Sequence, residues 1–234
     1  GTPAGAPGQH SGPRLRAMAT DGETFGHHHR FGEMALARVL LLLQDRPWVR
    51  VENFASFLAR NPPQDEVALV EPSSWSCPHG VDRWRKECGC RMDPLLPTQQ
   101  RWRAVLREAM DWLAEELHDR YRAEAPGLLG DPWEARDAYG AALAGGGGGA
   151  GEAAAGALGE LVRTRAPRSL DTEEEIRARE LLEMERNALR LFTSCGWFFD
   201  DLAGIEPVQV LRYAARALEL LGDDDAKAAF LALL

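Results

Sequence analysis

Residues 98–117 read TQQRWRAVLREAMDWLAEEL, and the pattern of this stretch decides the fold class. Its apolar side chains recur every three or four positions, which is the stride of an amphipathic α-helix, at Trp102, Val105, Leu106, Ala109, Trp112, Leu113 and Leu117. Asp131 and Pro132 then supply an N-cap and a favoured first position for a further helix. The sequence therefore predicts a mainly α fold.

The N-terminal side of this helix is more mixed. Residues 31–42 repeat apolar side chains at helical spacing until Pro47, and Asn53 can cap a second helix that runs to Arg60. Residues 14–20 are short, partly apolar and followed by an Asp-Gly turn signal, which favours a strand. Residues 66–70 alternate in polarity and predict a possible second strand.

The C-terminal side predicts helices divided by one insertion. The Gly- and Ala-rich residues 145–159 cannot bury enough apolar surface to offset their ordering entropy, so we expect a disordered insertion there. Residues 172–175, Thr-Glu-Glu-Glu, resemble a capping box at the start of a helix. A last amphipathic helix is expected from Pro207 toward Leu221.

Composition limits the classes of function. The 234 residues include 36 acidic and 27 basic ones, and the formal charge of −9 argues against nucleic-acid binding. No apolar run approaches the roughly 20 residues that span a bilayer, so no membrane segment is expected. The absence of Met at position 1 suggests a fragment of a longer chain, and residues 1–13 show no secretory signal. Four cysteines are too few for a disulfide framework, which favours the cytoplasm.

The loop at residues 20–29, TDGETFGHHH, gathers groups that transfer protons or bind sugar hydroxyls. Asp21 and Glu23 lie two apart and point the same way in an extended loop, where a carboxyl could protonate a leaving oxygen if burial raised its pKa. The alternative is a simple Asp-Gly turn. Residues 27–29 are three histidines that could form a metal site, sugar contacts or a polar helix start, although adjacent helical residues cannot all face one ion.

Two further segments carry candidate groups. Cys77, His79, Cys88 and Cys90 form a C-x-H and C-x-C pair that could hold zinc, with Cys195 as a possible substitute ligand. The alternative is that they are small buried side chains near tryptophans. Trp197 lies in an aromatic segment and could stack on a sugar ring or belong to the core.

Three blocks in this order resemble the C-terminal portion of family 57 glycoside hydrolases, specifically members that carry the domain of unknown function numbered 3536. The blocks are TDGETFGHHH at 20–29, SSWSCPHG at 73–80 with RWR at 83–85, and TSCGWFFD at 193–200. The resemblance covers most of the chain from Arg14 onward and leaves out the Gly-rich insertion.

The resemblance implies a fold and a site. Residues 14–20 would be the last strand of an incomplete (β/α)7 barrel, followed by a helical region. Asp21 would be the acid/base of a retaining mechanism on an oligosaccharide or α-glucan. The substrate contacts would be Glu23, His27, His28 and Trp197, with Trp197 projecting from the helical region toward the sugar, and no cofactor is expected. A non-catalytic, zinc-binding helical module that docks a partner is the alternative, with Cys77, His79, Cys88 and Cys90 as ligands.

The resemblance also implies a domain organisation. Residues 14–70 would form the end of the catalytic barrel with its following helices, and residues 71–234 a helical C-terminal domain. Residues 1–13 are rich in Gly, Pro and Ala without periodic apolar positions, and this composition predicts a flexible N-terminal segment. The family's nucleophilic Glu lies on an earlier strand, and a retaining mechanism needs two carboxyls about 5 to 5.5 Å apart on opposite faces of the sugar. We therefore expect the chain to be inactive alone and to need the missing N-terminal barrel as its partner.

Overall fold

The computed structural model describes residues 13–145 and 152–234, and the chain divides into two compact units, Gly1–Leu69 and Val70–Leu234. The described residues contain helices and isolated bridges but no β-strand, which confirms the mainly α prediction. None of the described helices combines the length and apolar character that a membrane crossing requires.

The first unit contains α1 (Gly32–Gln44) and α2 (Phe54–Arg60), both close to the predicted positions. Asn53 caps α2 as expected, because its Oδ1 accepts a hydrogen bond from the Ser56 N–H at 2.8 Å. None of the described residues of this unit is buried. Its apolar side chains, including those of α1, therefore do not form a core of their own.

The predicted strands are absent from the described residues, so the expectation of one residual barrel strand is wrong for this chain. Residues 14–20 and 66–70 have no regular secondary structure. A strand is held by hydrogen bonds to a neighbouring strand, and no described segment lies beside either stretch as a partner in a sheet. Local apolar patterning alone does not supply those bonds.

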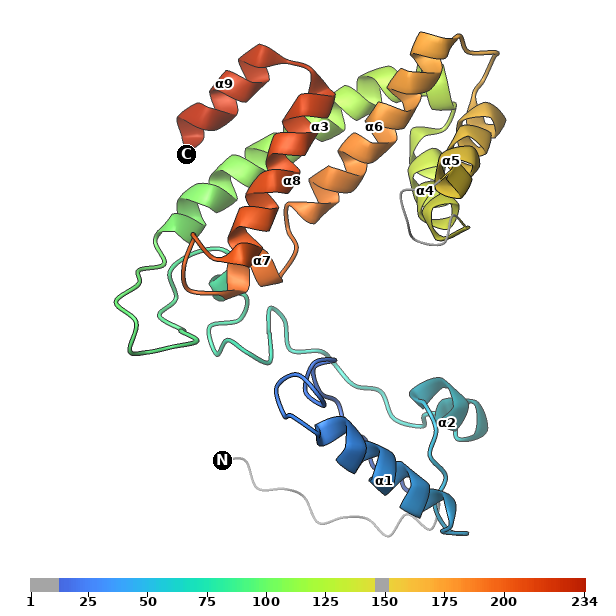
Figure 1. The fold of residues 1–234 in the computed structure, drawn as a ribbon, viewed down its shortest axis with the longest axis vertical. Helices are drawn as coiled ribbons and strands as arrows, with labels where there is room; N and C mark the ends of the chain where they lie inside the picture. Colours follow the sequence, from blue (N-terminus) through green and yellow to red (C-terminus); the bar gives the residue numbers. More distant parts are fainter. Residues whose placement is uncertain (1–12, 146–151) are drawn as a thin grey trace. The chain divides into compact units, whose positions relative to one another are not determined.

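The second unit is built on three long helices that lie side by side, α3 (Trp102–Leu129), α6 (Thr172–Arg190) and α8 (Ile205–Leu221) (Figure 1). Their apolar stripes meet in one core, in which Leu113, Leu117, Leu181 and Ala217 are fully buried. The helical hairpin of α4 (Pro132–Gly145) and α5 (Glu152–Arg165) packs against α6, and α9 (Asp224–Leu233) packs on α3. The long periodic pattern of residues 98–117 thus does form the central helix.

Two local features differ from the predictions. The N-cap of α6 is Asp171 with Glu174 at the third position, one residue earlier than the expected capping box. Residues 152–159 lie in α5 and are not part of a disordered insertion, because Ala, Glu and Leu among them favour the helix strongly enough to offset the two glycines. The predictions also included a flexible N-terminal segment and a disordered insertion. Their remaining residues, 1–12 and 146–151, lie outside the described residues.

The second unit also contains a long irregular segment, residues 70–101, which we call the cysteine loop. Its only described helical turn is the 3-10 helix η1 (Asp82–Trp84), which contacts the short helix α7 (Cys195–Phe198). Figure 1 shows the cysteine loop at the end of the bundle where α3 begins and α7 leads into α8. This end of the bundle contains the buried polar side chains of Arg83, Gln100, Arg103 and Asp200.

Candidate functional site

Four side chains of the cysteine loop meet at one point. The Cys77 Sγ lies 3.8 Å from the Cys88 Sγ and 3.9 Å from the Cys90 Sγ. The His79 Nδ1 lies 3.8 Å from the Cys77 Sγ and 3.6 Å from the Cys90 Sγ. All four atoms lie within 4.8 Å of one another. We call this group, Cys77, His79, Cys88 and Cys90, the cysteine–histidine cluster.

Tight turns bring these residues together. Gly89 separates Cys88 from Cys90 and has a φ of 85°, a left-handed conformation that glycine adopts without steric cost. This turn allows both cysteine side chains to face Cys77. On the other side, the Ser74 hydroxyl donates a hydrogen bond of 2.8 Å to the Gly80 carbonyl, which closes the turn that carries Cys77 and His79.

The environment changes the acidity of two thiols in opposite directions. Burial raises the pKa of the Cys77 thiol, but hydrogen bonds from the backbone of His79 and Arg83 and from the side chains of His79 and Cys88 outweigh it, and the pKa falls to about 7. Burial and the neighbouring thiols of Cys88 and Cys77 raise the pKa of Cys90 to about 11. Cys77 is thus the thiol that its surroundings prepare as a thiolate.

Arg83 fixes the cysteine loop to α7. Its side chain is 4% exposed, and its Nε donates to the Phe198 carbonyl at 3.0 Å. The guanidinium also lies over the Phe198 ring at 3.6 Å and donates to the Ser76 carbonyl, next to Cys77. One buried guanidinium side chain therefore joins the cluster to the helical core.

Asp200 and Gln100 make a second connection. The Gln100 Nε2 donates both to the Cys90 carbonyl at 2.9 Å and to the Asp200 Oδ1 at 2.7 Å. The Asp200 Oδ2 accepts hydrogen bonds from the backbone N–H groups of Met92 and Asp93. Arg103, fully buried, donates to the Gln100 Oε1. Buried polar groups of this kind hold neighbouring side chains in one arrangement.

Sequence reasoning missed this buried polar network. Arg83 lies in an irregular segment without a periodic pattern, and Gln100 and Asp200 are separated by 100 residues. The sequence does contain one signal of a buried polar group. Arg103 lies on the same face of the predicted helix as the apolar residues Leu106 and Met110. A charged residue within an apolar stripe indicates a buried partner.

The turn at residues 20–29, which we call the acidic–histidine turn, brings three of the predicted site residues together. Glu23, His27 and His28 offer ligand atoms within 4.8 Å of one another, and the Glu23 Oε2 lies 3.4 Å from the His28 Nε2. The His28 N–H donates to the Glu23 carbonyl at 3.0 Å, which closes the turn. The carboxylate of Asp21 is exposed and does not belong to this group, although its carbonyl accepts from the Thr24 N–H.

Trp197 lies in the core of the second unit. It is 1% exposed, its Nε1 donates to the Leu191 carbonyl at 3.0 Å, and its ring stacks on Trp102. A side chain so covered offers no ring face to a sugar, so the structure gives the predicted projection toward a substrate no support. An indole with a satisfied N–H is favourable in a core, and the alternative that Trp197 is a core residue fits.

Cys195 is the exposed cysteine among the described residues. It begins α7 and is not part of the cysteine–histidine cluster. The predicted role as a substitute ligand is therefore not needed, since the cluster already has four members.

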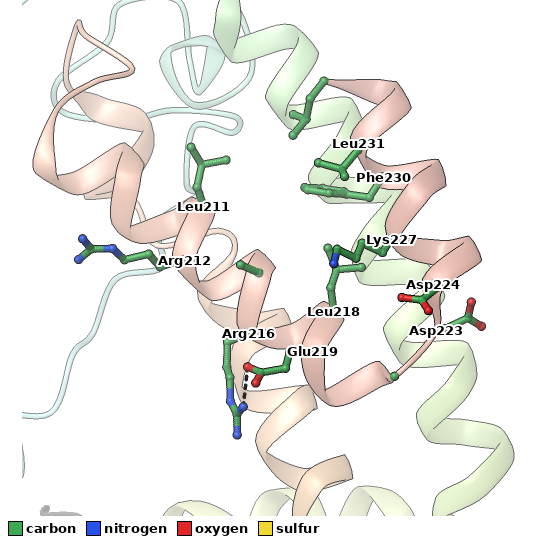
Figure 2. Close-up of a pocket in the computed structure, with 13 residues that line it drawn as sticks. Leu211, Arg212, Arg216, Leu218, Glu219, Asp223, Asp224, Lys227, Phe230 and Leu231 are labelled. Atoms are coloured by element: carbon green, nitrogen blue, oxygen red, sulfur yellow. Dashed lines mark hydrogen bonds and ion pairs between the residues drawn. The ribbon is translucent and has the colours of Figure 1, made fainter.

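A groove lies away from these residues, between α8 and α9. Figure 2 shows its lining, in which Leu218, Phe230 and Leu231 alternate with charged side chains such as Lys227. The groove measures about 770 Å³, and Arg216 and Glu219 form an ion pair of 2.7 Å at its edge. None of the predicted site residues lines it, so it is not a candidate site for the chemistry considered above.

Comparisons with known proteins gave one match. The family model described as "Domain of unknown function (DUF3536)" matches residues 99–234, which span α3 to α9. No curated protein and no solved structure matches the chain.

Proposed function

The chain belongs to the family defined by the domain of unknown function DUF3536, and on this premise we propose that it is the C-terminal part of a retaining glycoside hydrolase or glucanotransferase that acts on α-glycans. The observation that carries the proposal is the acidic–histidine turn, a D-G-E-x-F-G-H-H sequence that brings the Glu23 carboxylate to the His27 and His28 imidazoles and carries the exposed Asp21 beside them. This turn has the form of the block that holds the acid/base Asp in family 57 glycoside hydrolases, which the chain resembles.

In the proposed reaction, Asp21 protonates the leaving glycosidic oxygen and later removes a proton from the attacking water or acceptor hydroxyl. Glu23 accepts hydrogen bonds from sugar hydroxyls, while His27 and His28 donate to or accept from them. These side chains suit neutral, hydroxyl-rich ligands. The nucleophile comes from elsewhere, because Asp21 and Glu23 on one turn cannot flank opposite faces of a sugar ring.

A second observation supports the proposal that a further domain completes the active site. The first unit has no buried residue in its described part, and α1 exposes Met34 to 65% and Leu41 to 55%. Contiguous exposed apolar side chains mark surfaces that pack against other protein. We propose that a barrel domain supplies this partner surface, together with the nucleophilic Glu and the cover over Asp21 that an acid catalyst requires.

The test is Asp21→Asn in the enzyme that contains the barrel, assayed on α-glucans for hydrolysis and transfer. Loss of the acid/base should reduce the rate by about 10²- to 10⁴-fold. Asp45→Asn is the matched control, since Asp45 is an exposed carboxylate of the same unit at the end of α1, and it should retain full activity. Near-full activity of the Asp21→Asn enzyme would contradict the assignment.

The second candidate function is a non-catalytic, zinc-binding helical module, favoured by the spacing of Cys77, His79, Cys88 and Cys90. A metal in the second unit is compatible with both functions, so metal content does not separate them. Activity does: if the enzyme with its barrel acts on no α-glucan at all, the helical module is the better description.

A further inference from the structure

We propose that Cys77, His79, Cys88 and Cys90 bind one zinc ion in a closed, structural centre that holds the cysteine loop on the helical core. The inference does not depend on the proposed function, because it uses only residues of the second unit. It is carried by the distances between the ligand atoms, by the chemistry of the four side chains and by the way the fold holds them.

The distances are those of a tetrahedron around zinc. Zinc lies about 2.3 Å from thiolate sulfur and about 2.0 to 2.1 Å from imidazole nitrogen, which gives tetrahedral edges of about 3.8 Å between sulfurs and about 3.6 Å between sulfur and nitrogen. Two of the three sulfur pairs are 3.8 and 3.9 Å apart, and two of the three sulfur–nitrogen pairs are 3.8 and 3.6 Å apart. The other two pairs lie within 4.8 Å. The four atoms thus surround a space that fits one ion.

A disulfide does not explain this arrangement. A disulfide joins two sulfurs at about 2.0 Å and leaves the third thiol aside. Here the Cys77 Sγ lies at nearly equal distances from Cys88 and Cys90, and His79 faces the same point. A common centre accounts for all four contacts at once.

The ligand types select the metal. Three thiolates and one imidazole suit zinc, whereas calcium and magnesium take oxygen ligands. All four tetrahedral positions are filled by protein side chains, and Cys77 is 2% exposed. A complete protein ligand set leaves no position for water or substrate, so the centre is structural and not catalytic.

The surroundings compensate the charge of such a centre. Three thiolates with a divalent ion leave an excess negative charge. The buried Arg83 supplies a positive charge beside Cys77, and one of its guanidinium nitrogens, Nη2, is buried without a hydrogen-bond partner in the described residues. Gln100 holds the Cys90 carbonyl at 2.9 Å. Groups that orient the ligands from behind are a regular part of metal centres.

The zinc centre also stabilises a segment that has little regular structure of its own. The cysteine loop has one three-residue 3-10 helix as its described regular structure, and hydrogen bonds from Arg83, Trp84 and Met92 hold it to residues 194–200. Zinc joins residues 77 to 90 into one rigid unit, so that these contacts act together. Binding of a structural ion is coupled to folding of the segment that carries the ligands.

The first experiment measures metal in the unmodified chain, purified under reducing conditions without a metal-affinity step and dialysed. Elemental analysis should find one zinc per chain, and X-ray absorption should show three sulfur ligands and one nitrogen ligand. A folded, metal-free protein, or one with a disulfide among these cysteines and no response to a chelator or to added zinc, would overturn the proposal.

Three variants assign the site. Cys88→Ser should lose the stoichiometric zinc, whereas Cys195→Ser, which alters the exposed cysteine outside the cluster, should keep it. His28→Ala should also keep it, which separates the centre from the acidic–histidine turn. Zinc that survives Cys88→Ser but leaves with His28→Ala would refute the assignment. If Cys88→Ser does not fold, the sulfur count in the X-ray absorption spectrum of the unmodified chain decides.

Discussion

Asp200 is a buried carboxylate that holds the cysteine loop in place. It is 5% exposed, accepts from the backbone N–H groups of Met92 and Asp93, and accepts from Gln100, which also binds the Cys90 carbonyl. Asp200→Asn keeps the shape but sets an NH2 group against these donors. We expect the free energy of unfolding to fall by about 1 to 3 kcal/mol, and zinc affinity, measured by competition with a chelator, to fall about 10- to 100-fold.

Asp201→Asn provides the matched control for this prediction. Asp201 is the next residue, it is exposed, and its Oδ1 accepts from the Ala203 N–H, a contact that asparagine can also make. This variant should bind zinc as the unmodified chain does. Equal zinc affinity in the Asp200→Asn and Asp201→Asn proteins would show that the Asp200 network does not support the centre.

Gly196 lies where α7 contacts α8. A Cβ built on it would lie 2.2 Å from the Val210 Cγ2, and 3.2 Å from the Glu206 carbonyl oxygen. Gly196→Ala should therefore lower the free energy of unfolding by about 1 to 3 kcal/mol, as measured by denaturant titration. The cost should be smaller in a Val210→Ala background, where the clashing methyl groups are gone. A cost that is unchanged in that background would contradict the steric cause.

The N-terminus of α6 contains an acidic residue, Glu174, whose ionisation stabilises the helix. Hydrogen bonds from Arg168, and then from the Asp171 N–H, lower the pKa of Glu174 to about 2 from 4.5. A lowered folded-state pKa stabilises the protein above the unfolded value, and this stability is lost as the pH falls through the folded one. The stability lost in Glu174→Gln should thus be full near neutral pH and shrink as the pH falls from about 4.5 toward about 2.

Denaturant titrations of both proteins at a series of pH values test this prediction. Acid also removes zinc, but it does so in both proteins, so the difference between them isolates Glu174. Glu173→Gln, in the same first turn and without an ion pair in the described part of the chain, should show a much smaller change. A stability gap that stays constant from neutral pH to pH about 2 would exclude this role of the ion pair.

The elements also show which features could be predicted from the sequence. The periodicity of residues 98–117 predicted α3, because a helix depends on local spacing. The spacing of Cys77, His79, Cys88 and Cys90 predicted the cluster, because the four residues lie close together in the sequence. The strand predicted at residues 14–20 was wrong because strands depend on partners distant in sequence. The contact of Gln100 with Asp200 depends on the tertiary fold, so no local pattern could predict it.

The two units differ in how much apolar surface they bury. The second unit has one apolar core around α3, α6 and α8, whereas none of the described residues of the first unit is buried. Local stability follows buried apolar contact, so it should be distributed very unevenly along the chain. The measurement that reports this distribution is amide hydrogen exchange, read segment by segment.

We expect the amides of α3 near Leu113 and Leu117 to exchange only through global unfolding, while those of α1 exchange through local opening within the same experiment. Removal of zinc by a chelator should speed exchange in the cysteine loop far more than in the middle of α3, because the ion acts on the segment between Cys77 and Cys90.

Under the proposed function, a barrel domain should slow exchange in α1. If α1 is as protected as α3 in the chain alone, its exposed apolar side chains already have a partner, and the argument for a missing one fails.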